Sequence, residues 1–132
     1  MTPMPTQTKT MLVDDCVVSR TDAPVNLSIQ ILFGQLADIL VRIDGETVVQ
    51  YSNDDTNPPT SILLGSNNSL ADKTMRISVL VKDTNGNTDD SGVNVTLTGM
   101  PSLVNHLLLS KISPSGSTKF FSFEFNFFQM EP

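Results

Sequence analysis

The stretch FSFEFNF, residues 121–127, decides the fold class of this chain. Four phenylalanines recur at every second position, and Ser122, Glu124 and Asn126 stand between them. Successive side chains of a β-strand point to opposite faces, so this spacing gives one aromatic face and one polar face. Each ring removes on the order of 150 Å² from water when it is buried. We therefore expect a strand whose Phe121, Phe123, Phe125 and Phe127 face a hydrophobic core.

Two further phenylalanines flank this stretch on its other face. Phe120 and Phe128 have the parity of the polar residues, so the core cannot bury them together with the first four. An exposed aromatic surface on a terminal strand is a site at which a second chain can pack. The alternative interpretation of the Phe-rich strand is therefore a surface for self-association.

The same two-residue period extends along the rest of the chain and predicts further strands. Asp44-Gly45 is a typical hairpin turn between two of them. The segments that alternate are 11–18, which is the weakest, 25–33, 39–43, 47–51, 75–82 and 93–98, and a short apolar strand is expected at 62–64. Clusters of Gly, Pro, Asn and Asp separate these segments.

The segment 103–112 fits two structures. Its apolar residues have helical spacing behind Ser102 as an N-cap, but a strand is the favoured interpretation. The count is then eight or nine strands. Because a strand with one apolar face needs a second sheet to cover it, we expect an all-β fold, an antiparallel two-sheet sandwich of immunoglobulin-like or jelly-roll topology. Residues 1–132 are expected to form one domain, with a polar segment at 1–10.

Composition excludes several classes of partner. Fourteen acidic residues against eight basic ones give a net charge of -6, and the Lys and Arg residues are scattered singly. No basic cluster is present to neutralise a row of phosphates, so neither nucleic acid nor a membrane is an expected partner. The N-terminus lacks the basic and apolar regions of a secretory signal. We expect a cytoplasmic protein, or one that is released without a secretory signal peptide.

The sequence contains no recognisable catalytic motif. Cys16 is the one cysteine and His106 the one histidine, and they are far apart in the sequence. Nucleophilic catalysis needs a nucleophile beside a base, and zinc needs several His or Cys ligands. We expect no enzymatic activity, and we expect Cys16 to be a buried apolar residue.

The polar loop DTNGNTDD, residues 83–90, is the candidate metal site. Calcium prefers several oxygen ligands, and acids or amides stand at alternate positions here. The candidate ligands are Asp83, Asn85, Asn87, Asp89 and Asp90. The loop lacks the glycine and glutamate positions of an EF-hand, and Asn-Gly-Asn is also common in turns. The plain turn is the alternative interpretation.

The stretches ILVRIDGETVVQYS and MRISVLVKDTNGNTDDSGVNVTLTG, in their order and strand layout, resemble the small calcium-dependent bacterial lectins that bind fucose or mannose. The resemblance covers most of the chain and implies a β-sandwich. In that family an acidic loop between the last two strands holds paired calcium ions that bind sugar hydroxyls. The corresponding loop here, Ser113 to Lys119, has no carboxylate, so the sugar site is not carried over to these positions.

Three functions follow as hypotheses. The first is a non-catalytic binding module, whose ligand is a carbohydrate or another protein, since a rigid sandwich with polar loops needs nothing more. The second is a structural or assembly subunit of a homo-oligomer that associates through the C-terminal Phe-rich strand. An enzyme is the third and the least favoured. The absence of Trp and the single Tyr51 disfavour a stacking platform for sugars.

Overall fold

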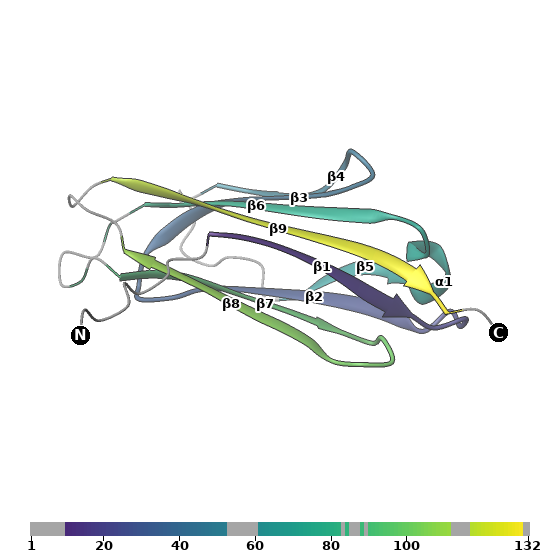
Figure 1. Cartoon of the computed structure of the whole chain (residues 1–132). Coiled ribbons are helices and arrows are strands. Elements are labelled where there is room, and N and C mark those ends of the chain that lie inside the picture. The colour runs from purple at the N-terminus through teal and green to yellow at the C-terminus, as the bar shows by residue number, and fades with distance from the viewer. Residues whose placement is uncertain are drawn as a thin grey trace, which may run out of the picture.

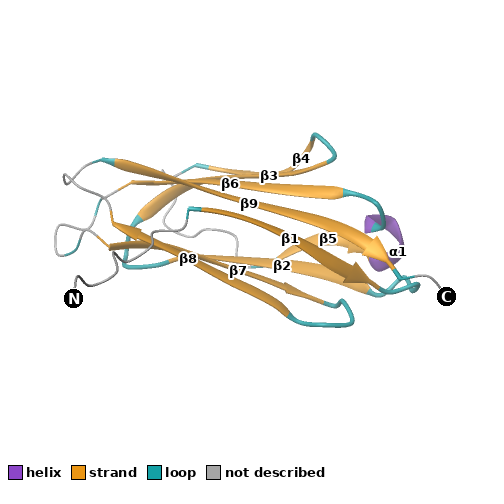
Figure 2. Cartoon of the chain, in the orientation of Figure 1, coloured by secondary structure: helices purple, strands orange, loops and turns teal. Residues whose placement is uncertain are grey.

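The computed structural model shows a two-layer β-sandwich and describes residues 10–52, 61–82, 84, 88, 90–111 and 117–130 (Figure 1). Two sheets stack face to face, and a short helix lies at one end of them (Figure 2). The strands are β1 (Met11–Val18), β2 (Pro24–Ile31), β3 (Leu36–Ile43), β4 (Glu46–Tyr51), β5 (Ile62–Ser66), β6 (Thr74–Lys82), β7 (Asp90–Thr98), β8 (Val104–Lys111) and β9 (Thr118–Gln129), and the helix is α1 (Asn67–Leu70).

The strand order places the C-terminal strand inside a sheet. The five-stranded sheet has the order β1-β9-β6-β3-β4, and the four-stranded sheet has the order β5-β2-β7-β8. All described strand pairs are antiparallel except β1 and β9, which run parallel. An all-β sandwich is thus confirmed, with this one parallel pair added to the expected antiparallel arrangement. The two strands are far apart in sequence, so no hairpin forces them to be antiparallel.

The Phe-rich stretch packs as the alternation predicts. Phe121, Phe123 and Phe125 are fully buried and Phe127 is 2% exposed, whereas Phe120 and Phe128 lie on the outer face. The rings of Phe123 and Phe125 are stacked, with centroids 6.3 Å apart. Opposite this aromatic layer, the four-stranded sheet contributes aliphatic side chains to the same core, among them Leu27, Ile29, Val95 and Leu97.

Several boundaries were predicted correctly from period and turn chemistry. Residues 11–18 form β1, and 104–111 form the strand β8 rather than a helix. The β3–β4 hairpin turns at Asp44 and Gly45, whose φ angles of 49° and 84° are those of a hairpin turn with both central residues left-handed.

The segments 25–33 and 62–70 differ from the prediction. Strand β2 ends at Ile31, and Phe33 lies in a turn with a φ angle of 60° instead of continuing the strand. Strand β5 continues to Ser66 instead of ending at residue 64, and α1 follows where only a break was expected. The Ser66 hydroxyl accepts a hydrogen bond from the Ser69 N–H, and the Ser69 hydroxyl accepts one from the Ser66 N–H. This reciprocal pair is a capping box built from two serines. Two serines are a weak signal for a helix, and α1 has only four residues.

Asn67 in α1 ties three segments together at this end of the sandwich. Its side chain is fully buried, its Oδ1 accepts from the Ser19 N–H, and its Nδ2 donates to the carbonyls of Ala23 and Gly99. A buried amide satisfied in this way fixes where the ends of β1 and β7 meet the start of β2.

In the part of the chain that is described, no helix is long and apolar enough to cross a membrane.

Candidate functional site

The predicted calcium loop lies mostly outside the described residues. This applies to Asp83, Asn85, Asn87 and Asp89. Asp90 is described and begins β7, where its carboxylate lies 3.3 Å from Lys111 Nζ and its carbonyl accepts from Gln35 Nε2. Among the residues with a described position, no three His, Cys, Asp or Glu side chains are grouped so that they could hold an ion. Calcium binding at 83–90 stays a prediction.

His106 and Cys16, the two residues with catalytic potential, both point into the interior at one side of the sandwich. His106 on β8 lies 2.7 Å from Asp14 on β1, measured from Nε2 to Oδ2, so this contact joins the edges of the two sheets. The imidazole also lies 6.0 Å from the ring of Phe125. Burial, followed by the carboxylates of Asp14 and Asp15, raises the pKa of the Cys16 thiol to about 12. At neutral pH this thiol is protonated, which is the unreactive form.

Exposed apolar and basic side chains suited to binding a partner molecule lie on the outer face of the five-stranded sheet. Strand register sets Leu80 directly beside Phe120, and Leu40 lies in the next row of the sheet. We call Leu40, Leu80 and Phe120 the apolar strip. Phe120 is 53% exposed, although it is an aromatic ring on a sheet face. A shallow hollow of about 310 Å³ lies over the strip and is also lined by Asp38, the register partner of Leu80, and by Gln50 and Ser78.

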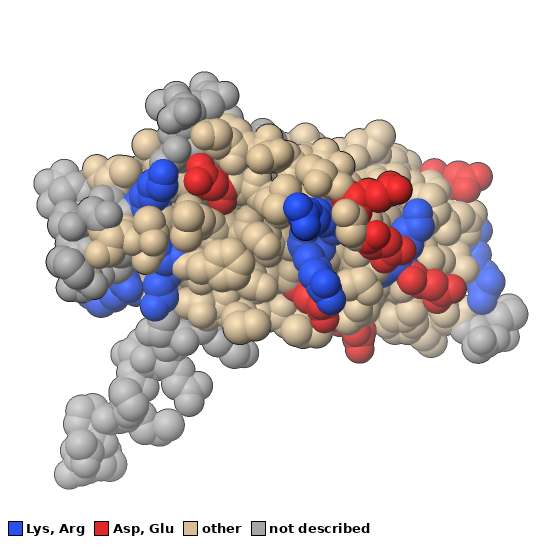
Figure 3. Space-filling view, turned by 90° about the horizontal axis from the view of Figure 1, so that it is seen from above, with Lys and Arg blue, Asp and Glu red and all other residues tan. Residues whose placement is uncertain are grey.

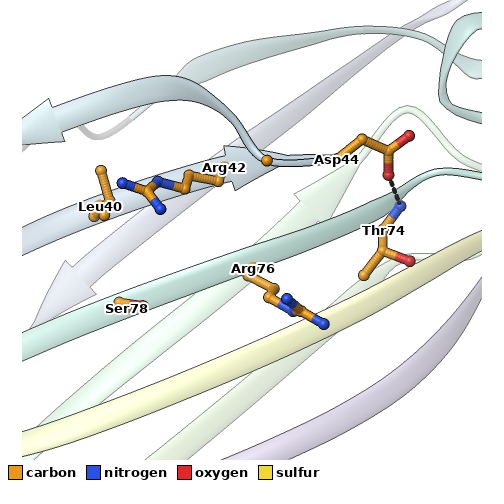
Figure 4. Close-up of a pocket in the computed structure, with 7 residues that line it drawn as sticks. Leu40, Arg42, Asp44, Thr74, Arg76 and Ser78 are labelled. Atoms are coloured by element: carbon orange, nitrogen blue, oxygen red, sulfur yellow. Dashed lines mark hydrogen bonds between the residues drawn. The ribbon is translucent and has the colours of Figure 1, made fainter.

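Two arginines lie directly opposite each other at one end of this strip. Arg42 of β3 is the register partner of Arg76 of β6, and both line a second hollow of about 330 Å³. Like charges directly opposite in a sheet are destabilising. The two guanidinium groups diverge in Figure 4, where Arg42 lies towards Leu40 and Arg76 lies over β9. This divergence relieves the repulsion in part.

The two arginines differ in their partners. Arg76 Nε lies 2.9 Å from the Glu124 carboxylate of β9, in a pair whose arginine side chain is 72% exposed. Arg42 is exposed and forms no hydrogen bond or ion pair with any residue that the structure describes. Arg42 is therefore a cation that is available to a partner molecule.

A third cation stands at the other end of the strip. Lys82 lies on the same strand and the same face as Arg76, six residues further along. At roughly 3.3 Å per residue the two positions are about 20 Å apart. Figure 3 looks onto this face and shows an uncharged area with basic side chains at both ends and acidic side chains beside them. The face is thus uncharged in the middle, with Arg42 and Arg76 at one end and Lys82 at the other, while Glu124 lies beside Arg76 and Asp38 lies opposite Leu80.

Sequence reasoning missed this arrangement, because the basic residues are isolated in the sequence. Arg42 and Arg76 were correctly placed on the polar sides of their strands by alternation. Only the antiparallel register of β3 with β6, which skips β4 and β5, makes them neighbours. The sequence signal that could have indicated this cluster is that each of the two strands carries one Arg at an outer-facing position, between short polar and apolar residues.

Comparisons of the chain with family models, with curated proteins and with solved structures found no match.

Proposed function

We propose that this chain is a non-catalytic protein-binding module, and that it binds its partner with the outer face of the five-stranded sheet. The partner is a protein surface with an apolar centre and acidic groups on either side of it. The observation that carries the proposal is the unpaired Arg42 directly opposite Arg76, at the end of the apolar strip.

The composition of this face supports protein recognition. Aromatic residues, Met and Arg are enriched in the centres of protein interfaces, and Arg and aromatic residues carry much of the binding energy there. Here a half-exposed Phe120 and two arginines lie on one sheet face, and Met11 of the neighbouring β1 is 68% exposed. An acidic partner would also remove the repulsion between Arg42 and Arg76.

The same geometry disfavours a second copy at this face. A two-fold axis through the middle of the apolar strip would bring Lys82 of one chain over Arg42 and Arg76 of the other. Such an interface brings cations close to cations, with Glu124 and Asp38 offsetting part of the repulsion, and like-charge contacts of this kind suppress wrong partners. Strand β9 is moreover paired on both sides, with β1 and with β6, so its backbone has no free edge to offer.

A non-catalytic role is supported by the state of the thiol. The pKa of the Cys16 thiol is raised to about 12 by burial and by nearby carboxylates. A thiol that is protonated at neutral pH is a poor nucleophile.

The test is selection from a random peptide display library. We expect enrichment of peptides with apolar residues between acidic ones, and a strong decrease of their affinity as salt is raised. The double variant Arg42→Glu with Arg76→Glu should weaken binding by tenfold or more, on the order of 1.4 kcal/mol. The matched control Lys73→Glu with Lys111→Glu changes the charge equally and lies off the apolar strip. Selected peptides without acidic residues, or equal losses in both variants, would contradict the proposal.

A carbohydrate ligand is the second candidate, and one observation favours it. On the outer face of the four-stranded sheet, the central strands carry only amides and hydroxyls at three successive pairs: Asn26 with Thr98, Ser28 with Thr96 and Gln30 with Asn94. Amides and hydroxyls are hydrogen-bonding partners for neutral sugars. A glycan array tests it, with Thr96→Lys expected to abolish any signal and Arg42→Glu expected to leave it intact. An array without signal removes this candidate.

A further inference from the structure

Among the described strands, β1, β4, β5 and β8 form the four sheet edges of the sandwich. The outer side of an edge strand presents unpaired N–H and C=O groups, which are a template for pairing with another chain. Natural proteins blunt such edges with short strands, bulges, charges or prolines. The four edges of this chain differ sharply in how they are protected.

Three of the edges carry such protection. Strands β4 and β5 have six and five residues, and each pairs with its neighbour through a register shift, which is the mark of a bulge or irregularity. Strand β1 carries Asp14 and Asp15 in its middle. A second β1 placed beside this one would bring carboxylates together. None of these three edges is suited to pairing with a copy of itself.

Strand β8 lacks these protections. It has eight residues, VNHLLLSK, and it keeps an unbroken register with β7 over its whole length. It contains no proline, glycine or acidic residue, and its one lysine, Lys111, is at the end. His106 points inward and contacts Asp14, so it does not block the edge.

Two large apolar side chains on β8 point to the solvent. Leu107 is 50% exposed and Leu109 is 47% exposed. They stand at alternate positions on the outer face, where their register partners on β7 are the uncharged Asn94 and Gly92. An uncharged, regular edge with exposed leucines is the kind of edge that pairs with another strand.

We infer that β8 is a dimerisation strand that pairs antiparallel with β8 of a second copy of this chain. A two-fold axis at Leu108 sets Leu107 opposite the partner's Leu109, and the symmetry repeats the contact. Asn105 then stands opposite the partner's Lys111, and no like charges face each other. The two four-stranded sheets become one eight-stranded sheet. Backbone hydrogen bonds join the two β8 strands, and the leucine pairs pack against each other across this junction.

The self-complementary spacing is what selects a second copy as the occupant. A foreign strand could use the same backbone groups, but Leu107 and Leu109 of one copy meet Leu109 and Leu107 of the other, and no charge on the edge specifies a different partner. The dimer leaves the apolar strip free, since that lies on the other sheet. This inference therefore stands independently of the proposed function.

The experiment is a measurement of solution mass by light scattering over a range of concentrations, on the full chain and on designed variants. We expect a dimer for the parent and a monomer for Leu107→Lys with Leu109→Lys, because each lysine faces a partner's lysine. Leu107→Lys with Leu109→Glu should restore the dimer, because each lysine then faces a partner's glutamate. Met11→Lys with Val13→Lys, at similarly exposed apolar positions on β1, should leave the dimer intact.

Circular dichroism of each variant confirms that it is folded before its mass is compared. A parent that is monomeric at every concentration overturns the inference. So does a dimer that survives the paired lysines on β8, and so does a charge-swapped variant that stays monomeric, because the antiparallel pairing about Leu108 requires the Lys–Glu match.

Discussion

Phe123 occupies the centre of the aromatic layer, fully buried and stacked on Phe125. Truncation of this ring to a methyl group removes its transfer free energy and leaves a cavity, so Phe123→Ala should lower the free energy of unfolding by about 3–5 kcal/mol. Urea denaturation measures it. Phe120→Ala is the control, because a ring that is 53% exposed should lose less than about 1 kcal/mol. Equal losses at the two positions would show that Phe123 is not a core residue.

Cys16 gives a prediction for alkaline pH. Burial, and then the carboxylates of Asp14 and Asp15, raise the pKa of its thiol from 9.0 to about 12. The unfolded chain therefore loses this proton first as pH rises, so the stability that depends on it is fully present below pH 9 and is lost between pH 9 and pH 12. The free energy of unfolding should fall more steeply in this window for the parent than for Cys16→Ala.

Denaturant titrations of both proteins, below pH 9 and inside the window, measure the two slopes. The other groups that titrate there are common to parent and variant, so the difference between the slopes belongs to Cys16. Identical slopes would mean that the thiol titrates alike in the folded and unfolded chains.

At the scale of elements, the strands were predictable and their pairing was not. The two-residue period located β2, β3, β6, β7 and β9, because burial on one face imposes that period on the sequence. The parallel pairing of β1 with β9 has no local signature, since more than a hundred residues separate Met11 from its partner Ser122. The helix α1 was missed because its capping serines are also typical of turns.

The polar loop 83–90 is the element whose chemistry is still open to experiment. If it holds calcium, binding to the native state alone must raise the melting temperature by mass action. We expect a higher melting temperature in excess calcium than with chelator, and we expect Asp83→Asn with Asp89→Asn to abolish the difference. Asp22→Asn with Asp72→Asn, acids outside the loop, removes the same charge and should preserve it. A parent that melts at one temperature in both conditions has a plain turn here.

For the whole molecule, the proposed binding face is a feature that the sequence alone does not reveal. The alternation correctly predicts that Arg42, Arg76 and Lys82 point outward, and the sequence contains no run of basic residues. Their positions at the ends of the apolar strip follow only from the register in which β3, β6 and β9 lie side by side. A cluster assembled from single residues on three strands is invisible to spacing rules, whereas a core strand is visible because all its evidence is local.

The molecule as a whole should unfold as one cooperative unit. The two sheets share a single core cluster, to which the described strands β1, β2, β3, β5, β6, β7, β8 and β9 all contribute buried side chains. Loss of one sheet would expose the core face of the other sheet to water. The free-energy cost of this exposure couples the unfolding of the two sheets.

Two natural probes lie at opposite edges of the five-stranded sheet, the single Tyr51 on β4 and the single thiol of Cys16 on β1. Tyr51 fluorescence, pulsed labelling of Cys16 and far-ultraviolet circular dichroism should therefore give one urea midpoint. An earlier midpoint for Tyr51 would show that β4 detaches before the core opens, and an earlier midpoint for Cys16 would show the same for β1.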